Sequence, residues 1–362
     1  MKFFAVLVLL ILSLIGPVSA ESYDIDKNDT VKNSLNDDVR DYFDKNGIDI
    51  ETDEWVKNIT PENVFSHILT FFKNGLKKPL ISLGIITAII IINALLFEKE
   101  NSEISPIVTY AATISIAGTI ITPIFASINT AIGAMKACAT FMTAFIPIFA
   151  AITAATGKAV TSVSMSTLLL GAANGVSLLS NFGVIPFIGG YLSLSLAAGV
   201  SPFMNSGGIS QAVKKLALWV LSLITTVFLG ILSIQTVVNA HADNISMRTA
   251  KFIVGSAVPV AGGVLSEALG TLTASMSLLK STVGIYGVVI CCLIFLPIII
   301  ELVLWRITLW VSDFVALQFS LSKISGLLQS LDTVLSVLIG IILLTCAMFI
   351  ISLSVVMGSV NV

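Results

Sequence analysis

Charge is what this chain of 362 residues has least of. Only 11% of its residues are Asp, Glu, Lys or Arg, whereas 56% are apolar; a soluble domain has about 25% charged residues. A water-soluble fold cannot cover so large an apolar fraction with so few charged side chains. The composition therefore excludes an ordinary soluble domain. The lack of a basic stripe likewise excludes a nucleic-acid-binding protein.

Histidine and cysteine are also scarce. The two histidines, His67 and His241, lie far apart in the sequence, and the four cysteines all lie in apolar stretches. These cysteines are Cys138, Cys291, Cys292 and Cys346. None shows the two-residue spacing of a zinc or redox pair. We therefore expect buried thiols, no metal site and no cofactor.

Motifs for catalysis are missing as well. The chain has no His-Glu-x-x-His helix, no phosphate-binding loop and no nucleophile elbow. The phrase Gly199-Val200-Ser201-Pro202 resembles a catalytic serine turn, but it lacks the second glycine and a nearby histidine. The sequence therefore predicts no catalytic residue, and we expect a protein that is not an enzyme.

The first twenty residues have the pattern of an export signal. Lys2 precedes an apolar run over residues 3–15, and Val18-Ser19-Ala20 forms a cleavage site of small residues. The pattern predicts a signal peptide over residues 1–20. An uncleaved first transmembrane helix is the alternative, and either one places the following segment outside the cytoplasm.

An acidic segment follows the signal. Residues 21–75 contain 13 acidic and 6 basic side chains. Leu35, Val39 and Tyr42 fall at helical spacing, and Thr60 is a suitable N-cap for a second short helix. The sequence predicts a small extracytoplasmic helical segment over residues 21–78.

Residues 79–362 contain apolar stretches that are long enough to cross a bilayer, which takes about 20 residues. The candidate spans are 79–97, 105–128, 138–156, 160–181, 184–203, 216–238, 252–279, 283–304 and 334–357. Proline and glycine interrupt several of them, and interrupted backbone at membrane depth is typical of re-entrant helices. We expect an all-α, polytopic helical membrane protein with about seven to nine transmembrane or re-entrant helices.

The orientation follows from the exported amino terminus. If all nine segments cross, Lys99, Lys158 and Lys280 lie in the cytoplasm and Arg306 lies outside. Residues 307–324 fit either an interfacial helix or a helix buried in the bundle.

Two stretches of the membrane part resemble each other, about 127–170 and 233–280. Each has a Ser-Ile phrase, then a proline, Pro147 or Pro259, and then Ser-Met-Ser and Leu-Leu. Chance similarity in an apolar sequence is one explanation and internal duplication is the other. Duplication would place helices broken at these prolines opposite each other, as in secondary transporters.

Seven positions are therefore candidates for a conformational or pathway role. Five are helix-breaking positions: Pro147, Pro186, Pro259, Gly262 and Gly263. The other two, Glu267 and Glu301, are ionisable groups in apolar stretches, where charge is costly and usually functional. The alternative is structural: Glu267 lies in a wet loop and Glu301 pairs with Arg306.

The carboxy-terminal half carries a resemblance to a known family. Residues 250–263 read Ala-Lys-Phe-Ile-Val-Gly-Ser-Ala-Val-Pro-Val-Ala-Gly-Gly, and Glu267 and Leu278-Leu279-Lys280-Ser281-Thr282-Val283-Gly284 follow. This pattern resembles the stage III sporulation protein AE family of endospore-forming bacteria.

The resemblance implies a multi-pass protein of the mother-cell membrane that surrounds the forespore. It implies membership of a transenvelope channel complex, with other stage III sporulation membrane proteins and a forespore-side partner, that supports forespore development. It supplies no catalytic residues. A secondary transporter or permease for a small solute or ion is the alternative, and association with further copies of the chain is left open.

Overall fold

The computed structural model describes residues 72–73, 75–97, 105–200, 206–257 and 262–358. The predicted signal peptide, the predicted short helices of residues 21–71 and Pro259 lie outside these residues. The described elements are α6 (Lys77–Phe97), α7 (Ser105–Ala155), α8 (Ala159–Leu178), the π-helix η2 (Leu179–Val184), α9 (Ile185–Val200), α10 (Ser206–Ala257), α11 (Gly262–Gln318) and α12 (Ser322–Gly358). No strand occurs among them, which confirms the predicted all-α class.

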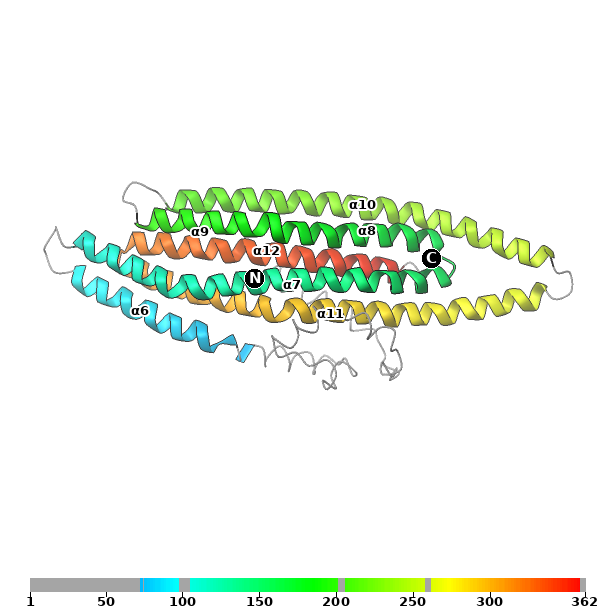
Figure 1. Cartoon of the computed structure of the whole chain (residues 1–362), viewed down its shortest axis with the longest axis horizontal. Helices are drawn as coiled ribbons and strands as arrows, with labels where there is room; N and C mark the ends of the chain where they lie inside the picture. The colour runs from blue at the N-terminus through cyan, green and yellow to red at the C-terminus, as the bar shows by residue number, and fades with distance from the viewer. Residues whose placement is uncertain (1–71, 74, 98–104, 201–205, 258–261, 359–362) are drawn as a thin grey trace.

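The helices form an elongated bundle in which successive rods run in opposite directions (Figure 1). α8, η2 and α9 follow one another as one rod. The turn between α7 and α8 contains Gly157, and the turn between α11 and α12 contains Ser320. Both residues have a positive φ, 83° and 58° respectively. We name the two ends of the bundle after them, the Gly157 end and the Ser320 end.

Ser320 ends α11 in a Schellman motif. Its N–H donates to the Leu317 carbonyl at 3.0 Å, and the N–H of Leu321 donates to the Ala316 carbonyl at 3.0 Å. This motif needs a left-handed residue after the helix, a position that glycine usually fills. The reversal between α11 and α12 is therefore tight and hydrogen-bonded, although no glycine in the sequence signals it.

Six helical stretches in the described part are long and apolar enough to cross a membrane. They are Lys77–Leu96, Ile107–Ala155, Ala159–Leu178, Gln211–Asp243, Val283–Gln318 and Ser322–Met357. This confirms a polytopic helical membrane protein. The sequence predicts about seven to nine helices. The structure has six such stretches in its described part, because some neighbouring spans that the sequence predicts belong to one continuous rod.

The expected break at Pro147 is wrong. The sequence predicts two separate spans here, residues 105–128 and 138–156, with a helix break at Pro147 in the second. In the structure both belong to α7, which is one helix that runs through Pro123 and Pro147. An apolar helix tolerates proline where neighbouring helices and side chains compensate for the lost hydrogen bond. At 1.5 Å per residue, α7 is about 76 Å long, against about 30 Å for the hydrocarbon core of a bilayer.

The segment around Pro186 is also continuous. Pro186 is the second residue of α9, and the π-helix η2 joins α9 to α8 without a loop. A π-helical turn widens the backbone locally without ending the rod. The predicted spans 160–181 and 184–203 are thus one rod, and no re-entrant hairpin occurs there.

Residues 307–324 do not form a separate helix. The first part of this stretch is the end of α11, and α12 begins at Ser322. Trp310, Phe314 and Leu317 lie on one face and are 70%, 58% and 52% exposed. The end of α11 is therefore neither an independent interfacial helix nor a buried one, and it exposes an apolar stripe at the Ser320 end.

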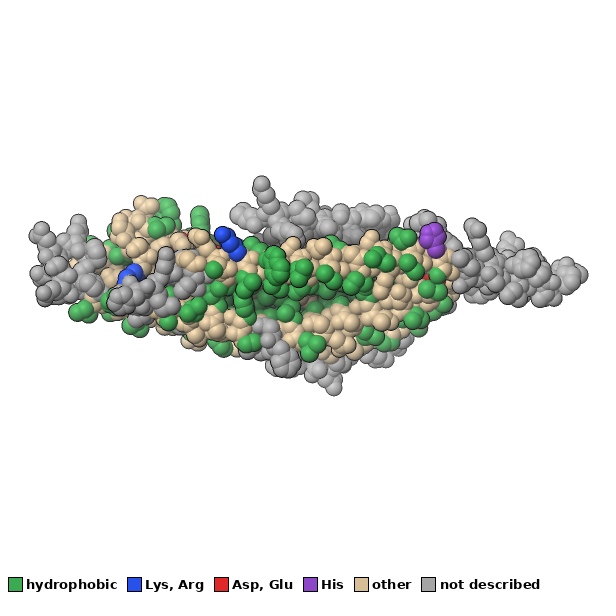
Figure 2. Space-filling model, turned by 90° about the horizontal axis from the view of Figure 1, so that it is seen from above, with side chains coloured by type: hydrophobic (Ala, Val, Ile, Leu, Met, Phe, Trp, Pro, Cys, Tyr) green, Lys and Arg blue, Asp and Glu red, His purple; other side chains and the backbone are tan. Residues whose placement is uncertain are grey.

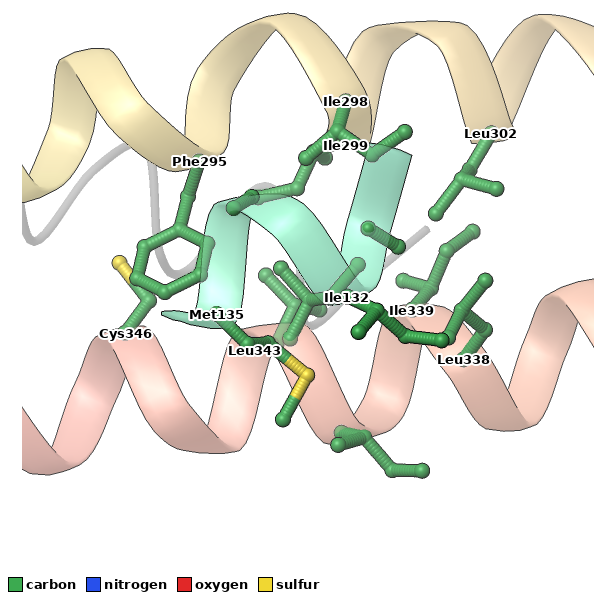
Figure 3. Close-up of a cluster of buried hydrophobic side chains, with 14 of the residues drawn as sticks. Ile132, Met135, Phe295, Ile298, Ile299, Leu302, Leu338, Ile339, Leu343 and Cys346 are labelled. Carbon is green, nitrogen blue, oxygen red and sulfur yellow. The ribbon is translucent and has the colours of Figure 1, made fainter. Parts of the chain in front are cut away.

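The core of the bundle lies between α7, α11 and α12. Figure 3 shows Met135 of α7 beside Phe295 of α11 and Leu343 of α12. Along α7, the ring centroid of Phe145 lies 5.2 Å from that of Phe141 and 5.7 Å from that of Phe149. These rings sit one turn apart and fill the space between the three helices.

Two glycines of α11 permit this close packing. A Cβ at Gly287 would lie 2.7 Å from the Phe145 ring, and one at Gly284 would lie 2.3 Å from the Met357 sulfur. Small residues let helix backbones approach closely in membranes. The glycines therefore hold α11 against α7 and α12.

α10 covers the outside of the bundle and is apolar there as well. Its exposed side chains include Trp219, Val227 and Ile234. Figure 2 shows a face with hydrophobic side chains along most of its length and charged side chains at few places. The hydroxyl groups of threonines on α10 donate hydrogen bonds to carbonyls of the same helix, as Thr225 does to the Leu221 carbonyl at 2.7 Å. Such a surface suits contact with a lipid bilayer.

Candidate functional site

Charged side chains make polar contacts between helices at several places in the described part of the bundle. They lie at three levels: along the middle of α11, at the Ser320 end and at the Gly157 end. Polar groups inside apolar helices need partners, because an unsatisfied group costs free energy there.

Glu301 lies along the middle of α11 and contacts α7. Its Oε1 accepts a hydrogen bond of 2.5 Å from the hydroxyl of Ser127 on α7. Ser127 is fully buried, and its Oγ also lies 3.1 Å from the Pro123 carbonyl. Glu301 is half-buried, so the carboxyl joins α11 to α7 with one oxygen at the interface.

Arg306 binds Asp332 rather than Glu301. Its Nε lies 2.7 Å from Asp332 Oδ1, and its Nη2 lies 3.1 Å from Oδ2. The alternative in which Glu301 pairs with Arg306 is wrong, because five positions along a helix place two side chains about 140° apart around the axis. The bidentate pair instead ties the end of α11 to α12.

Asp313 forms a second link between these helices. Its Oδ1 accepts a hydrogen bond of 2.5 Å from Ser325, and its Oδ2 accepts one of 3.2 Å from the amide of Gln329. Both donors are neutral. Ser325, Gln329 and Asp332 recur every three or four residues on α12, so they share one face toward α11.

α7 also makes a polar contact with α12 at the Ser320 end of the bundle. Lys323 of α12 donates a hydrogen bond of 2.9 Å to the hydroxyl of Tyr110, and its ammonium lies 4.4 Å from the centre of the Tyr110 ring. The ring thus offers both an oxygen and a π-face to one cation. The Ser320 end is consequently held together by polar contacts among α7, α11 and α12.

A cavity of about 220 Å³ opens at the Ser320 end between α10, α11 and α12. Its polar lining comprises Gln211, Lys214, Asp313, Gln329, Asp332 and Thr333. Its apolar lining comprises Leu309, Trp310 and Leu328. The cavity therefore combines both signs of charge with an apolar wall.

The Gly157 end is organised around Asp243 of α10. Its Oδ1 accepts a hydrogen bond of 2.9 Å from the N–H of Val160, and its Oδ2 accepts from the N–H of Thr161 at 3.1 Å and from the Thr161 hydroxyl. Asp243 is buried and caps the first turn of α8 from a different helix. Burial lowers the pKa of the neighbouring Lys158, and the nearby Asp243 charge partly opposes that shift.

The structure does not bring the predicted site residues together. Glu267 and Glu301 both belong to α11, and the 34 positions between them correspond to about 51 Å along a continuous helix. Gly262 and Gly263 begin α11. Pro147 is exposed within α7, far along the helix from Ser127, and Pro186 is exposed on α9. Only Glu301 among them makes a described contact between helices.

Sequence reasoning missed Ser127, Asp243, Asp313 and Asp332. Three of these are carboxylates within or beside apolar stretches, the same signal that singled out Glu301. The spacing of Ser325, Gln329 and Asp332 was available as a second signal for the α12 face. Ser127 offered none, because serine is frequent throughout the apolar helices.

The cysteines lie as expected inside the bundle. Cys138, Cys291 and Cys346 are buried and Cys292 is half-buried, all as free thiols. The sulfurs of Cys138 and Cys291 lie 3.7 Å apart across the α7–α11 interface. Among the described residues, no three His, Cys, Asp or Glu side chains group closely enough to hold a metal ion.

Comparison with known proteins adds a family match. The family described as stage III sporulation protein AE matches residues 34–360. A relative named stage III sporulation protein AE, from Bacillus subtilis (strain 168), is 30% identical over 164 residues. That match covers 45% of this chain and 41% of the relative, so it spans less than half the relative's length. No solved structure matches the chain.

Proposed function

The chain belongs to the stage III sporulation protein AE family, and from that premise we propose that it is a membrane component of the sporulation transenvelope channel complex between mother cell and forespore, needed for forespore development. The observation that carries this proposal is the extent of the family match, residues 34–360. The match includes most of the acidic segment as well as the helical bundle. The two parts therefore act together in the proposed role.

The proposal has a definite orientation in the mother-cell membrane around the forespore. Residues 21–78 lie outside the cytoplasm, and α6 leads from them to the Ser320 end of the bundle (Figure 1). The Ser320 end then faces the cytoplasm. Because α7 is a single rod, Lys158 lies at the opposite end from the α6–α7 connection, and Arg306 lies at the cytoplasmic end. Both placements are the reverse of those expected for nine crossings.

The proposed partners are other stage III sporulation membrane proteins and a forespore-side protein. Residues 21–75, with 13 acidic and 6 basic side chains, supply a charged surface for such contacts. The apolar exterior of α10 supplies the contact with the bilayer or with further copies of the chain. The protein acts in this role without catalysis and without a cofactor.

A secondary transporter or permease for a small solute or ion is the second candidate. The observation that favours it is the Glu301 carboxyl at the α7–α11 interface, since ionisable groups in membrane helices often belong to ion or proton pathways. Glu267 would be a second such group on the same helix.

Deletion of residues 21–78 behind an intact signal tests the channel proposal. The variant should enter the membrane, as membrane fractionation would show, and yet block spore formation. A matched variant keeps the segment and replaces Glu267 and Glu301 with Gln. Normal sporulation of the Glu variant together with failure of the deletion supports the channel component. The opposite pattern would favour the transporter.

A further inference from the structure

The cavity at the Ser320 end contains a carboxylate without a cationic partner. Within the described part of the chain, Asp313 receives hydrogen bonds only from Ser325 and Gln329, both neutral donors. The other carboxylate of the lining, Asp332, has both oxygens engaged by Arg306. The negative charge left uncompensated in the cavity is therefore that of Asp313.

A cation without an anionic partner lines the same cavity from another helix. Lys214 belongs to α10, and no carboxylate in the described part of the chain lies within ion-pair distance of its ammonium. Asp313 and Lys214 thus line one cavity without pairing with each other. Opposite charges held apart in this way suit a ligand that carries both signs.

The apolar residues of the lining indicate the size and apolar part of such a ligand. Trp310 is 70% exposed and lines the cavity one turn before Asp313. An aromatic ring in the same lining as a carboxylate can add a cation–π contact to a bound ammonium group. Leu309 and Leu328 add an apolar wall. The volume of about 220 Å³ is below the roughly 300–1,000 Å³ of pockets for drug-sized ligands, so the ligand is small.

We propose that this cavity binds a small zwitterion of the amino-acid class. Its ammonium group lies between Asp313 and Trp310, its carboxylate lies at Lys214, and its apolar part lies against Leu309 and Leu328. The pairing of Arg306 with Asp332 keeps Asp332 from competing for the ammonium. The site is independent of the proposed place in the channel complex, and binding is measured on the isolated protein.

Calorimetric titration of the full chain in detergent tests the site. The probes are three zwitterions of different size, namely glycine, L-leucine and 5-aminovalerate. Two analogues of leucine each lack one charge, namely isopentylamine and 4-methylpentanoate. We expect saturable binding of at least one zwitterion, with leucine favoured by the apolar wall. Each single-charge analogue should bind at least tenfold more weakly than leucine.

Three variants locate the binding. Asp313→Asn keeps an acceptor for Ser325 but removes the charge, and Lys214→Met removes the cation from an exposed position where folding does not depend on it. Each should weaken binding at least tenfold. Lys215→Met alters the adjacent exposed lysine, which does not line the cavity, and should leave binding unchanged. Absence of binding by all three zwitterions overturns the proposal. So does unchanged affinity in Lys214→Met, or an amine that binds as tightly as leucine.

Discussion

Glu301 on α11 and Ser127 on α7 are 174 positions apart in the sequence and share a hydrogen bond of 2.5 Å. The contact joins an ionisable side chain to a fully buried hydroxyl between two central helices of the bundle. Removing the hydroxyl would leave the carboxyl without its described partner. This makes Ser127 the more informative residue to change.

Ser127→Ala should lower the free energy of unfolding by about 0.5–1.7 kcal/mol, the range of an interhelical hydrogen bond in a membrane protein. Unfolding in SDS, followed by circular dichroism, measures the change. Ser115→Ala is the control, because the exposed Ser115 hydroxyl bonds only to the Ala111 carbonyl of its own helix. Equal effects of the two substitutions would contradict an interhelical role for Ser127.

The sequence was sufficient to select Glu301 but not to find its partner. An acid within an apolar stretch is rare, so it stands out, whereas the position of Ser127 depends on how α7 and α11 pack. The alternative pairing with Arg306 rests only on closeness in the sequence. Helical geometry turns it toward α12 instead, where Asp332 meets it.

Gly287→Val should destabilise the bundle by about 1–3 kcal/mol, the usual cost of overpacking a filled core. The Phe145 ring and Leu353 occupy the space that the new side chain would need. Gly230→Val is the matched control, since nothing lies within 4 Å of a Cβ at Gly230 on the exposed side of α10. Thermal unfolding of both variants in detergent measures the difference. A loss as large for Gly230→Val would rule out the packing explanation.

Asp243→Ala should lower the pKa of Lys158 further. Burial already lowers that pKa, and the Asp243 charge is the contribution that raises it. A larger neutral fraction of the amine should therefore react faster with formaldehyde and cyanoborohydride at pH 8, as mass spectrometry of the Lys158 peptide would show. The reactivity of Lys215, on an exposed helix face, serves as the internal reference. Slower methylation of Lys158 would reverse the expected sign.

Cysteine labelling tests whether α7 crosses as one rod. In a background with the four native cysteines replaced by alanine, Lys158→Cys and Ser320→Cys place thiols at opposite ends of the bundle. The variants are expressed in vegetative cells, where the protein inserts in the plasma membrane, and an impermeant maleimide added to these intact cells should label the first and spare the second. Labelling of both thiols from the same side would contradict the arrangement in Figure 1.

The number and type of membrane helices followed from the sequence better than their ends did. Apolar runs identified each rod, but Pro147 was interpreted as a break because proline ends most helices in water. Within α7, Pro147 is exposed and the helix continues through it, while Phe145 and Phe149 on either side pack in the core. The α11–α12 turn was missed for the converse reason, since Ser320 holds a conformation usually signalled by glycine.

We propose that this chain works as a membrane component of the sporulation channel complex. The most direct test of this claim is affinity purification of the tagged full-length protein from detergent-solubilised membranes of its sporulating host, with mass spectrometry of the bound proteins. Other stage III sporulation membrane proteins should co-purify, and they should be lost when residues 21–78 are deleted. Recovery of the folded protein without any of them would contradict the claim.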